Sequence, residues 1–417
     1  MKKSNILGIL SILTAMLMLL AACTAADPSV PDGSGAPEQT TGFIGKVNVG
    51  MCCPCSGSLG FLGPWMANSA RVEIDKINAQ GGLLGYEINF MFKDDEGVPQ
   101  NSLNVVREFI EKDSCVMIIG PAFSTNALAT KQLINDSKVI QMLPNATGDE
   151  NLKDAPYTFR TSETDTMRYH SMVTFMKAKN YQNIGLITMN DATGDQFKVM
   201  MPELLQNAGL SLAGIETFRA DDTDVSAYML KLKQAGAEVV IIGNGNSTYA
   251  ARVAVAKETL DWDVLLLGVG GLEGGTYPQL AGEAAAGTVF VVGYRGWQAG
   301  VDFDDMPKGY SEHMRAIIDQ YGTFDQGNGV LAIQGTTPCG DAVALWAEAV
   351  RVAGSFGADE VKAAMESGKV VVASGVSPSG ADLIVDAQTH ECYSVESLYF
   401  YSWELFEDGR WGFVEVN

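Results

Sequence analysis

Short apolar runs separated by longer amphipathic stretches recur along this chain from Lys46 onward. An apolar run of four to eight residues bounded by turn residues is typical of a strand buried on both faces in a parallel sheet. Such runs are too short for buried helices. They predict strands at 46–50, 86–92, 115–120, 139–143, 183–189, 210–218, 239–243, 264–267 and 289–292.

Helical periodicity and helix-end residues fill the gaps between these strands. Pro64 and the pair Gly81-Gly82 bracket one helix, with proline at its start and glycine past its end. The pattern predicts helices at 64–78, 99–112, 195–207, 224–234, 247–258, 307–321 and 337–352. The alternating residues of 397–403 and 411–416 flank Asp408-Gly409 and predict a C-terminal β-hairpin.

The order of these elements predicts the fold class. Strand and helix alternate up to residue 143, and the pattern restarts at Asn183. Repeated β-α units form parallel, doubly wound sheets that carry their sites at the carboxyl ends of the strands. Two successive half-units of matching layout therefore predict an α/β protein with two similar Rossmann-like lobes.

One stretch is a strong candidate for a ligand site. A buried strand ends at Gly120-Pro121, and Ser124, Thr125 and Asn126 then precede an alanine-rich helical run. Strand, tight turn and helix N-terminus leave backbone N–H groups exposed to a ligand, an arrangement that favours an anion or a carboxylate. The local sequence leaves a second interpretation open, in which Ser124 only caps its own helix.

The N-terminus reads as an export signal. Residues 1–22 have a basic start, an apolar run and then small residues, and Leu20-Ala-Ala-Cys23 resembles the lipobox of bacterial lipoproteins. That resemblance implies a lipid on Cys23 that anchors the mature chain to the membrane. The alternative is an ordinary cleaved signal peptide. No later apolar stretch is long enough to predict a transmembrane span.

Residues 23–42 are rich in proline, glycine, serine and threonine and predict a flexible tether. Without Lys2 and Lys3, 26 basic residues stand against 50 acidic ones, a formal charge of −24. Such a charge makes nucleic acid a poor partner and favours solubility.

The cysteines offer a weaker signal. Cys52 and Cys55 form a Cys-x-x-Cys spacing, but no second ligand pair is present and the three histidines are scattered. A structural disulfide or small buried thiols are expected, and no metal or cofactor.

A set of motifs, taken in order, resembles the substrate-binding lipoproteins of ABC importers of the branched-chain amino acid type, with the type I periplasmic-binding fold. The motifs span the chain from about Lys46 to its end. They are Ser56-Gly57 with Gly63, Glu73–Gly85, Asp94-Asp95-Glu96, Gly120-Pro121-x-x-Ser124, Pro144–Thr147, Asp221–Ser226 and Asp408-Gly-Arg-Trp.

The resemblance implies two lobes joined by crossing hinge strands, with the ligand held in a cleft between them. The first lobe would comprise residues 43–163 and a returning part at 294–368. The second would comprise residues 164–293 and a C-terminal segment at 369–417.

The same resemblance implies the ligand-binding residues. In the first lobe, Ser124 with Thr125 would hold a ligand carboxylate, and Thr147 would add a second hydroxyl beside Asn145 and Ala146. The remaining implied contacts come from the first loop and the second lobe: Leu62, Trp65, Thr193, Tyr294 and Trp297. Thr248 and Glu273 are further candidates in the second lobe.

The chain departs from the family's amino-acid binders at one position that matters. Those proteins place an acidic residue after the strand at 239–243 to hold the α-ammonium group, and the loop here reads Asn244-Gly-Asn-Ser-Thr248. A buried, unpaired ammonium is costly. Either another acid such as Asp191 or Glu273 pairs with it, or the ligand is another carboxylate or an amide without an amine; the second is favoured.

The predicted function is an extracytoplasmic, lipid-anchored solute-binding protein, monomeric and not an enzyme. It would deliver a small organic ligand to an ABC permease, in a periplasm if the cell has an outer membrane. Two alternatives remain: a ligand-sensing receptor domain for a signalling partner, and an exported thiol oxidoreductase that uses Cys52 and Cys55.

Overall fold

The computed structural model describes residues 42–56, 60, 62–243, 246–269, 272–274, 276–293, 303–322, 336–393, 398–407, 409 and 411–416. The chain from Phe43 onward forms one compact unit. The predicted signal peptide, most of the tether, Cys23, Tyr294 and Trp297 lie outside the described residues. Within the described residues, no helix is both long enough and apolar enough to cross a bilayer.

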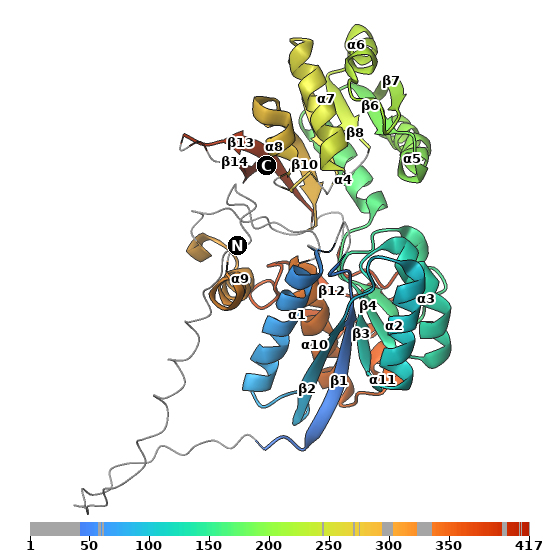
Figure 1. Ribbon diagram of the computed structural model, residues 1–417, viewed down its shortest axis with the longest axis vertical. Helices are drawn as coiled ribbons and strands as arrows, with labels where there is room; N and C mark the ends of the chain where they lie inside the picture. The colour runs from blue at the N-terminus through green and yellow to red at the C-terminus, as the bar shows by residue number, and fades with distance from the viewer. Residues whose placement is uncertain are drawn as a thin grey trace, which may run out of the picture. The chain divides into compact units, whose positions relative to one another are not determined.

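The first sheet has five parallel strands in the order β2-β1-β3-β4-β5 (Figure 1). Helix α1 packs against α10, and α2 packs against α3. The strands are β1 (Gly45–Cys52), β2 (Tyr86–Lys93), β3 (Met117–Ile119), β4 (Ile140–Leu143) and β5 (Thr158–Arg160). The helices of this part are α1 (Leu62–Ala79), α2 (Pro99–Glu111), α3 (Ser124–Ser137), α9 (Lys308–Tyr321), α10 (Thr336–Ala353) and α11 (Ala358–Met365).

The second sheet has the order β14-β13-β10-β9-β8-β6-β7. Its strands pair in parallel from β10 to β7, whereas β13 is antiparallel to both β10 and β14. Its strands are β6 (Asn183–Met189), β7 (Ser211–Phe218), β8 (Val239–Ile242), β9 (Leu265–Gly268), β10 (Val289–Val292), β13 (Tyr399–Leu405) and β14 (Trp411–Glu415). Its helices are α4 (Asp165–Ala178), α5 (Ala192–Ala208), α6 (Ser226–Gln234), α7 (Ser247–Thr259) and α8 (Thr276–Ala281). The prediction of an α/β fold with two lobes is confirmed.

Alternation along the central strands explains why helices cover both faces of the second sheet. In β8, Val239 and Ile241 belong to the core that contains residues of α4 and α5. Val240 and Ile242 belong to the opposite core, which contains residues of α6, α7 and α8. Successive side chains of a strand point to opposite faces, so an all-apolar strand needs a helix layer on each side.

Several elements, most of them short, escape the sequence pattern. These are β5, α4, α8, α11 and the small hairpin of β11 (Val371–Val372) with β12 (Leu383–Ile384). Strand β5 has only three residues, and α4 buries Arg168, Tyr169 and Ser171 together with its apolar residues, which blurs its hydrophobic stripe. Helix α1 begins at Leu62 rather than at Pro64, and β3 is shorter than the predicted 115–120.

Polar side chains fix the segment Thr161–Thr164, through which the chain passes from the first sheet to the second. The Thr161 hydroxyl donates to the carbonyl oxygen of Pro338 in α10 at 2.8 Å. Glu163 pairs with Arg168, whose Nη2 lies 2.5 Å from Glu163 Oε1, and both side chains are almost fully buried. A buried pair of this kind is costly to break, because either charge alone would be left without a partner.

A buried carboxyl also ties α10 to the returning chain. Asp341 is fully buried and accepts hydrogen bonds from the Ser379 N–H at 3.0 Å and from the Tyr393 hydroxyl at 2.7 Å. Burial raises the pKa of this carboxyl to about 7. Hydrogen bonds from Ser379 and Tyr393 oppose the effect of burial without cancelling it.

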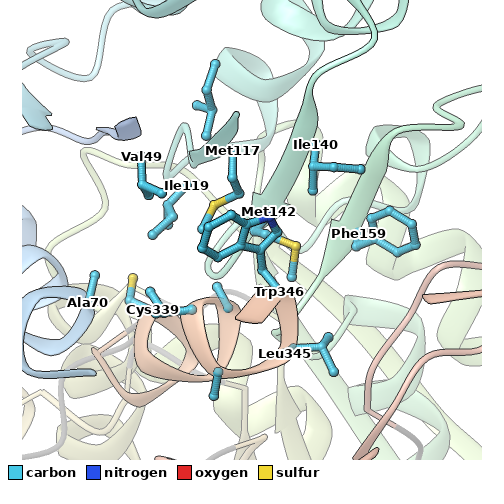
Figure 2. Packing of buried hydrophobic residues seen from close by; sticks show 14 of the residues in the cluster. Val49, Ala70, Met117, Ile119, Ile140, Met142, Phe159, Cys339, Leu345 and Trp346 are labelled. Carbon is cyan, nitrogen blue, oxygen red and sulfur yellow. The ribbon is translucent and has the colours of Figure 1, made fainter. Parts of the chain in front are cut away.

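Truncation of Trp346 should destabilise the core of the first sheet. Its side chain is fully buried and extends from α10 toward Met117 and Met142 of the strands (Figure 2). We expect Trp346→Ala to lower the free energy of unfolding by about 3–5 kcal/mol, measured by urea denaturation. Val352→Ala, at an exposed position of the same helix, should change it by less than about 0.5 kcal/mol. A Trp346→Ala effect as small as that of the control would contradict the packing described.

Asp341 should make stability fall as pH rises through neutrality. A carboxyl whose pKa is raised on folding favours the folded state at lower pH, and this contribution is lost as pH rises through the folded-state pKa near 7. The slope should approach about 1.4 kcal/mol per pH unit for one proton. Urea unfolding of Asp341→Asn at pH 5.5, 7.0 and 8.5 should show a shallower decline than the unsubstituted protein.

Two features sharpen this pH experiment. Burial also raises the pKa of Glu391 to about 7, so some decline should remain in Asp341→Asn. Asp359→Asn serves as the control: its carboxyl is exposed, and hydrogen bonds from Tyr157 and Lys138 lower its pKa. That carboxyl titrates well below pH 5.5, so its removal should leave the slope unchanged. Equal slopes for the Asp341→Asn variant and the unsubstituted protein would refute the assignment.

Candidate functional site

The turn between β3 and α3 is shaped by one glycine. Gly120 has a φ of +89°, and a Cβ at this position would lie 2.2 Å from the carbonyl oxygen of Cys52. Only glycine tolerates both constraints. The chain then turns so that α3 begins at Ser124, with its first-turn N–H groups directed out of the carboxyl end of the first sheet.

Ser124 does not cap its own helix, contrary to the structural interpretation that the sequence left open. The N-cap residue is Phe123, and it provides no side-chain cap. The Ser124 Oγ instead accepts a hydrogen bond from the Gly148 N–H at 3.0 Å, across 24 residues of sequence. A hydroxyl that accepts in this way still has its own proton to donate. The Ser124 hydroxyl is therefore available as a hydrogen-bond donor at the start of α3.

The loop after β4 lies against this helix start through two further contacts. Asn151 Nδ2 donates to the Ser124 carbonyl oxygen at 2.8 Å, and Asn145 Nδ2 donates to the Ala122 carbonyl oxygen at 3.1 Å. Asn145 is 7% exposed, and its Oδ1 has no hydrogen-bond partner. The two turns thus combine a hydroxyl donor on Ser124 with an unused acceptor on Asn145.

The other predicted residues of the first lobe have mixed surroundings. Thr125 is exposed and donates to the Asn126 side chain, while Thr147 is half-buried, with its carbonyl oxygen bound by Arg160. Ala146 is fully buried in a small apolar cluster with Ala127 and Leu143.

Two further predicted residues lie on α1. Leu62 is buried in the core of the first sheet. Trp65 is half-buried and packs both on that core and on the apolar cluster of α9. These contacts are those of an aromatic side chain packed between two apolar clusters.

In the second lobe, the predicted residues do not form one described cluster. Thr193 lies in the first turn of α5, and Thr248 is exposed in α7, where it lines a groove of roughly 360 Å³ with Arg252, Val255 and Leu280. Glu273 is 3% exposed. It stands in the electrostatic field of Arg168, whose guanidinium already pairs with Glu163 and Asp165.

The Asp94-Asp95-Glu96 motif has a structural role at the same end of the sheet. The Asp94 carboxylate accepts from the Cys55 N–H at 2.8 Å and so fixes the loop after β1. The fully buried Asp95 accepts from Ser102 at 2.7 Å, and Ser102 in turn accepts from Asn126 of α3. This chain of contacts was not anticipated from the sequence.

The cysteines lack the features of a reactive dithiol. The six cysteines in the described part of the chain are free thiols, and of these only Cys55 is exposed. Burial and the neighbouring Asp95 raise the pKa of Cys52, and burial raises that of Cys55 to about 11. A thiol oxidoreductase needs an accessible thiol of lowered pKa. Cys52 is buried, and the exposed Cys55 has a raised rather than a lowered pKa.

Comparison with known proteins gives the family. Residues 46–409 match the family described as "Periplasmic binding protein". The chain is 25% identical over 263 residues to the Leu/Ile/Val-binding protein homolog 3 of Brucella melitensis, covering 62% of this chain and 71% of that protein. It is 22% identical over 325 residues to the leucine-, isoleucine-, valine-, threonine- and alanine-binding protein of Pseudomonas aeruginosa, covering 77% and 82%.

Solved structures share the fold at low sequence identity. The branched-chain amino acid transporter substrate binding protein of Streptococcus pneumoniae, in complex with isoleucine, has a TM-score of 0.68 and 21% identity, covering 89% of this chain and all of that one. A solute binding protein of an ABC transporter from R. palustris, in complex with 4-hydroxybenzoate, has a TM-score of 0.71 and 17% identity, covering 89% and 96%.

These relatives are binding proteins rather than enzymes, and the chain is accordingly not an enzyme. Its family match extends over most of its length, and its two-sheet architecture is that of the matched structures. The chain belongs to the periplasmic binding proteins, as a type I solute-binding protein of the branched-chain amino acid-binding family.

Proposed function

We propose that this protein captures a small organic carboxylate between its two lobes and delivers it to an ABC import permease. The observation that carries the proposal is Ser124. Its Oγ accepts from Gly148, so its proton is free for a ligand oxygen at the N-terminus of α3. The helix dipole and the unpaired first-turn N–H groups favour a negative charge at this position. Thr125 follows Ser124 in the chain, and Thr147 precedes Gly148.

The ligand is proposed to carry a second polar group that donates a hydrogen bond. Asn145 Oδ1 is buried and has no partner, although a buried acceptor without one is costly. Because Asn145 Nδ2 already donates to the Ala122 carbonyl oxygen, the orientation of the amide leaves Oδ1 as an acceptor. A ligand hydroxyl or amide N–H would satisfy it.

An α-ammonium group is the less favoured partner. Asp191 accepts from the Gly194 N–H at 2.7 Å as the cap of α5, and Glu273 faces the positive charge of Arg168. Both acids that could replace the missing one after β8 therefore have other interactions. The relatives include binders of isoleucine and of 4-hydroxybenzoate, so the fold accommodates carboxylates with and without an amine.

Cys23 is proposed to carry the lipid that anchors the chain to the outer face of the cell membrane. Residues 24–42, rich in proline, glycine, serine and threonine, would be the spacer between the lipid and the folded part. Delivery to the permease, the lipid anchor and the monomeric state are parts of the same proposal. Mass spectrometry of the protein from its own membrane should show a lipidated N-terminal peptide that begins at Cys23. A soluble mature chain would refute the anchor and leave the binding function in place.

A thermal-shift screen tests the ligand class. We expect 4-hydroxybenzoate or other amine-free carboxylates to raise the melting temperature more than L-leucine and L-isoleucine do. A ligand at about one hundred times its Kd stabilises the folded state by about 2.7 kcal/mol, which such a screen detects. Stabilisation by leucine and isoleucine alone would contradict the amine-free class and direct attention to Asp191 and Glu273.

Ser124→Ala should weaken the binding of whichever carboxylate stabilises the protein. Loss of a hydrogen bond to a charged group costs about 1.5–3 kcal/mol, or roughly 10- to 150-fold in Kd by titration calorimetry. Ser137→Ala makes the same chemical change at the last residue of α3 and should leave Kd unchanged. An affinity of Ser124→Ala within twofold of the unsubstituted protein would remove Ser124 from the site.

A further inference from the structure

Arg160 is a fully buried cation at the end of β5, where the chain leaves the first sheet. Its backbone joins two segments that are distant in sequence. The Arg160 N–H donates to the His390 carbonyl oxygen at 3.0 Å, and the Cys392 N–H donates to the Arg160 carbonyl oxygen at 3.1 Å. Arg160 therefore holds the outgoing segment 161–164 beside the returning segment 390–393.

The Arg160 side chain reaches a third segment, the loop after β4. Nη1 donates to the Thr147 carbonyl oxygen at 2.7 Å, and Nη2 donates to the Gly148 carbonyl oxygen at 2.8 Å. Nε lies 3.5 Å from Glu391 Oε2, within ion-pair distance but without a hydrogen bond between the two atoms. The planar fork of arginine suits three simultaneous partners, whereas a lysine ammonium on a flexible stem does not reproduce them.

Gly148 transmits this contact to the ligand site. Its carbonyl oxygen accepts from Arg160, and its N–H donates to Ser124 Oγ at 3.0 Å. A Cβ on Gly148 would lie 3.1 Å from Ser124 Oγ, so a side chain at this position would crowd the Ser124 hydroxyl. A continuous series of hydrogen bonds thus runs from the segments 161–164 and 390–393 through Arg160 and Gly148 to Ser124.

We propose that Arg160 is a positioning residue that couples two of the segments joining the lobes, 161–164 and 390–393, to the ligand site. It does so by holding the Thr147–Gly148 peptides and through them the Ser124 hydroxyl. The coupling rests on the proposed function, since it assigns Arg160 a part in ligand affinity without contact with the ligand. A rearrangement of the segments at Arg160 would move the loop that orients Ser124. Conversely, a ligand that fixes Ser124 would favour one arrangement of these segments.

Arg160→Lys provides the test, made on the compact unit that begins at Phe43. Three quantities are measured: amide hydrogen exchange without ligand, Kd for L-isoleucine and 4-hydroxybenzoate, and the melting temperature. We expect exchange in the peptide that covers residues 144–152 to accelerate about tenfold or more, because a closely held loop then opens locally. Kd for the probe that binds the unsubstituted protein should rise about tenfold, with exchange in β8 and β9 unchanged.

Lys131→Met is the matched control. Lys131 Nζ donates to the Glu150 carbonyl oxygen at 2.9 Å and so contacts the same loop through an exposed hydrogen bond. Exchange and Kd should stay within twofold of the unsubstituted protein. If Arg160→Lys does not fold, the double variant Arg160→Met with Glu391→Gln is used in its place, because it removes both buried charges together. The same changes in exchange and Kd are expected of the double variant.

The outcomes separate the coupling from the proposed function. Loop exchange within twofold of the unsubstituted protein overturns the coupling, and so does acceleration of equal size in β8 and β9, which would show a general loss of stability. Faster loop exchange with an unchanged Kd overturns it as well. If neither probe binds the unsubstituted protein, the choice of ligand fails, and the exchange of residues 144–152 alone decides whether Arg160 holds the loop.

Discussion

Burial of both faces of the central strands is the constraint on which the rest of this structure depends. Strands β3, β4, β8 and β10 expose none of their residues. Parallel strands of this kind need helices on each side, and the chain must cross over the sheet between consecutive strands. These crossovers place the loops that follow the parallel strands at the same edge of their sheet. The turns after β3 and β4 meet at that edge, where Ser124 accepts from Gly148.

Buried charges impose a second requirement at the places where the chain passes between the sheets. Arg160 and Arg168 are both almost completely buried, and each faces a carboxylate, Glu391 and Glu163. Apolar residues would fill these positions without the cost of desolvation. What the guanidinium groups add is geometry, because each donates in several fixed directions. Arg160 uses this property to join three segments that the sequence keeps far apart.

Most of the secondary structure could be predicted because the signal is local. Strands 183–189 and 289–292 have the predicted bounds, and Gly209 ends α5 in the left-handed conformation expected of a helix C-terminus. The prediction of secondary structure failed where an element is held by tertiary contacts and has no hydrophobic periodicity of its own. Helix α4 buries Arg168 against Glu163, a polar pair that no hydrophobic periodicity reveals. Strand β5 has three residues, and its last residue pairs with Glu391, more than 200 positions away.

The sequence alone determined the alternation of strands and helices and the two-lobe family, and it singled out the stretch around Ser124 as a candidate site. Apolar periodicity, turn residues and motif order are properties of neighbouring residues, so they survive without coordinates. The partner of the Ser124 hydroxyl, the free Oδ1 of Asn145 and the reach of Arg160 were decided only by the tertiary structure. Each depends on a contact across at least ten residues, and hydrogen-bond direction over such separations is set by the packing of helices on sheets rather than by local sequence.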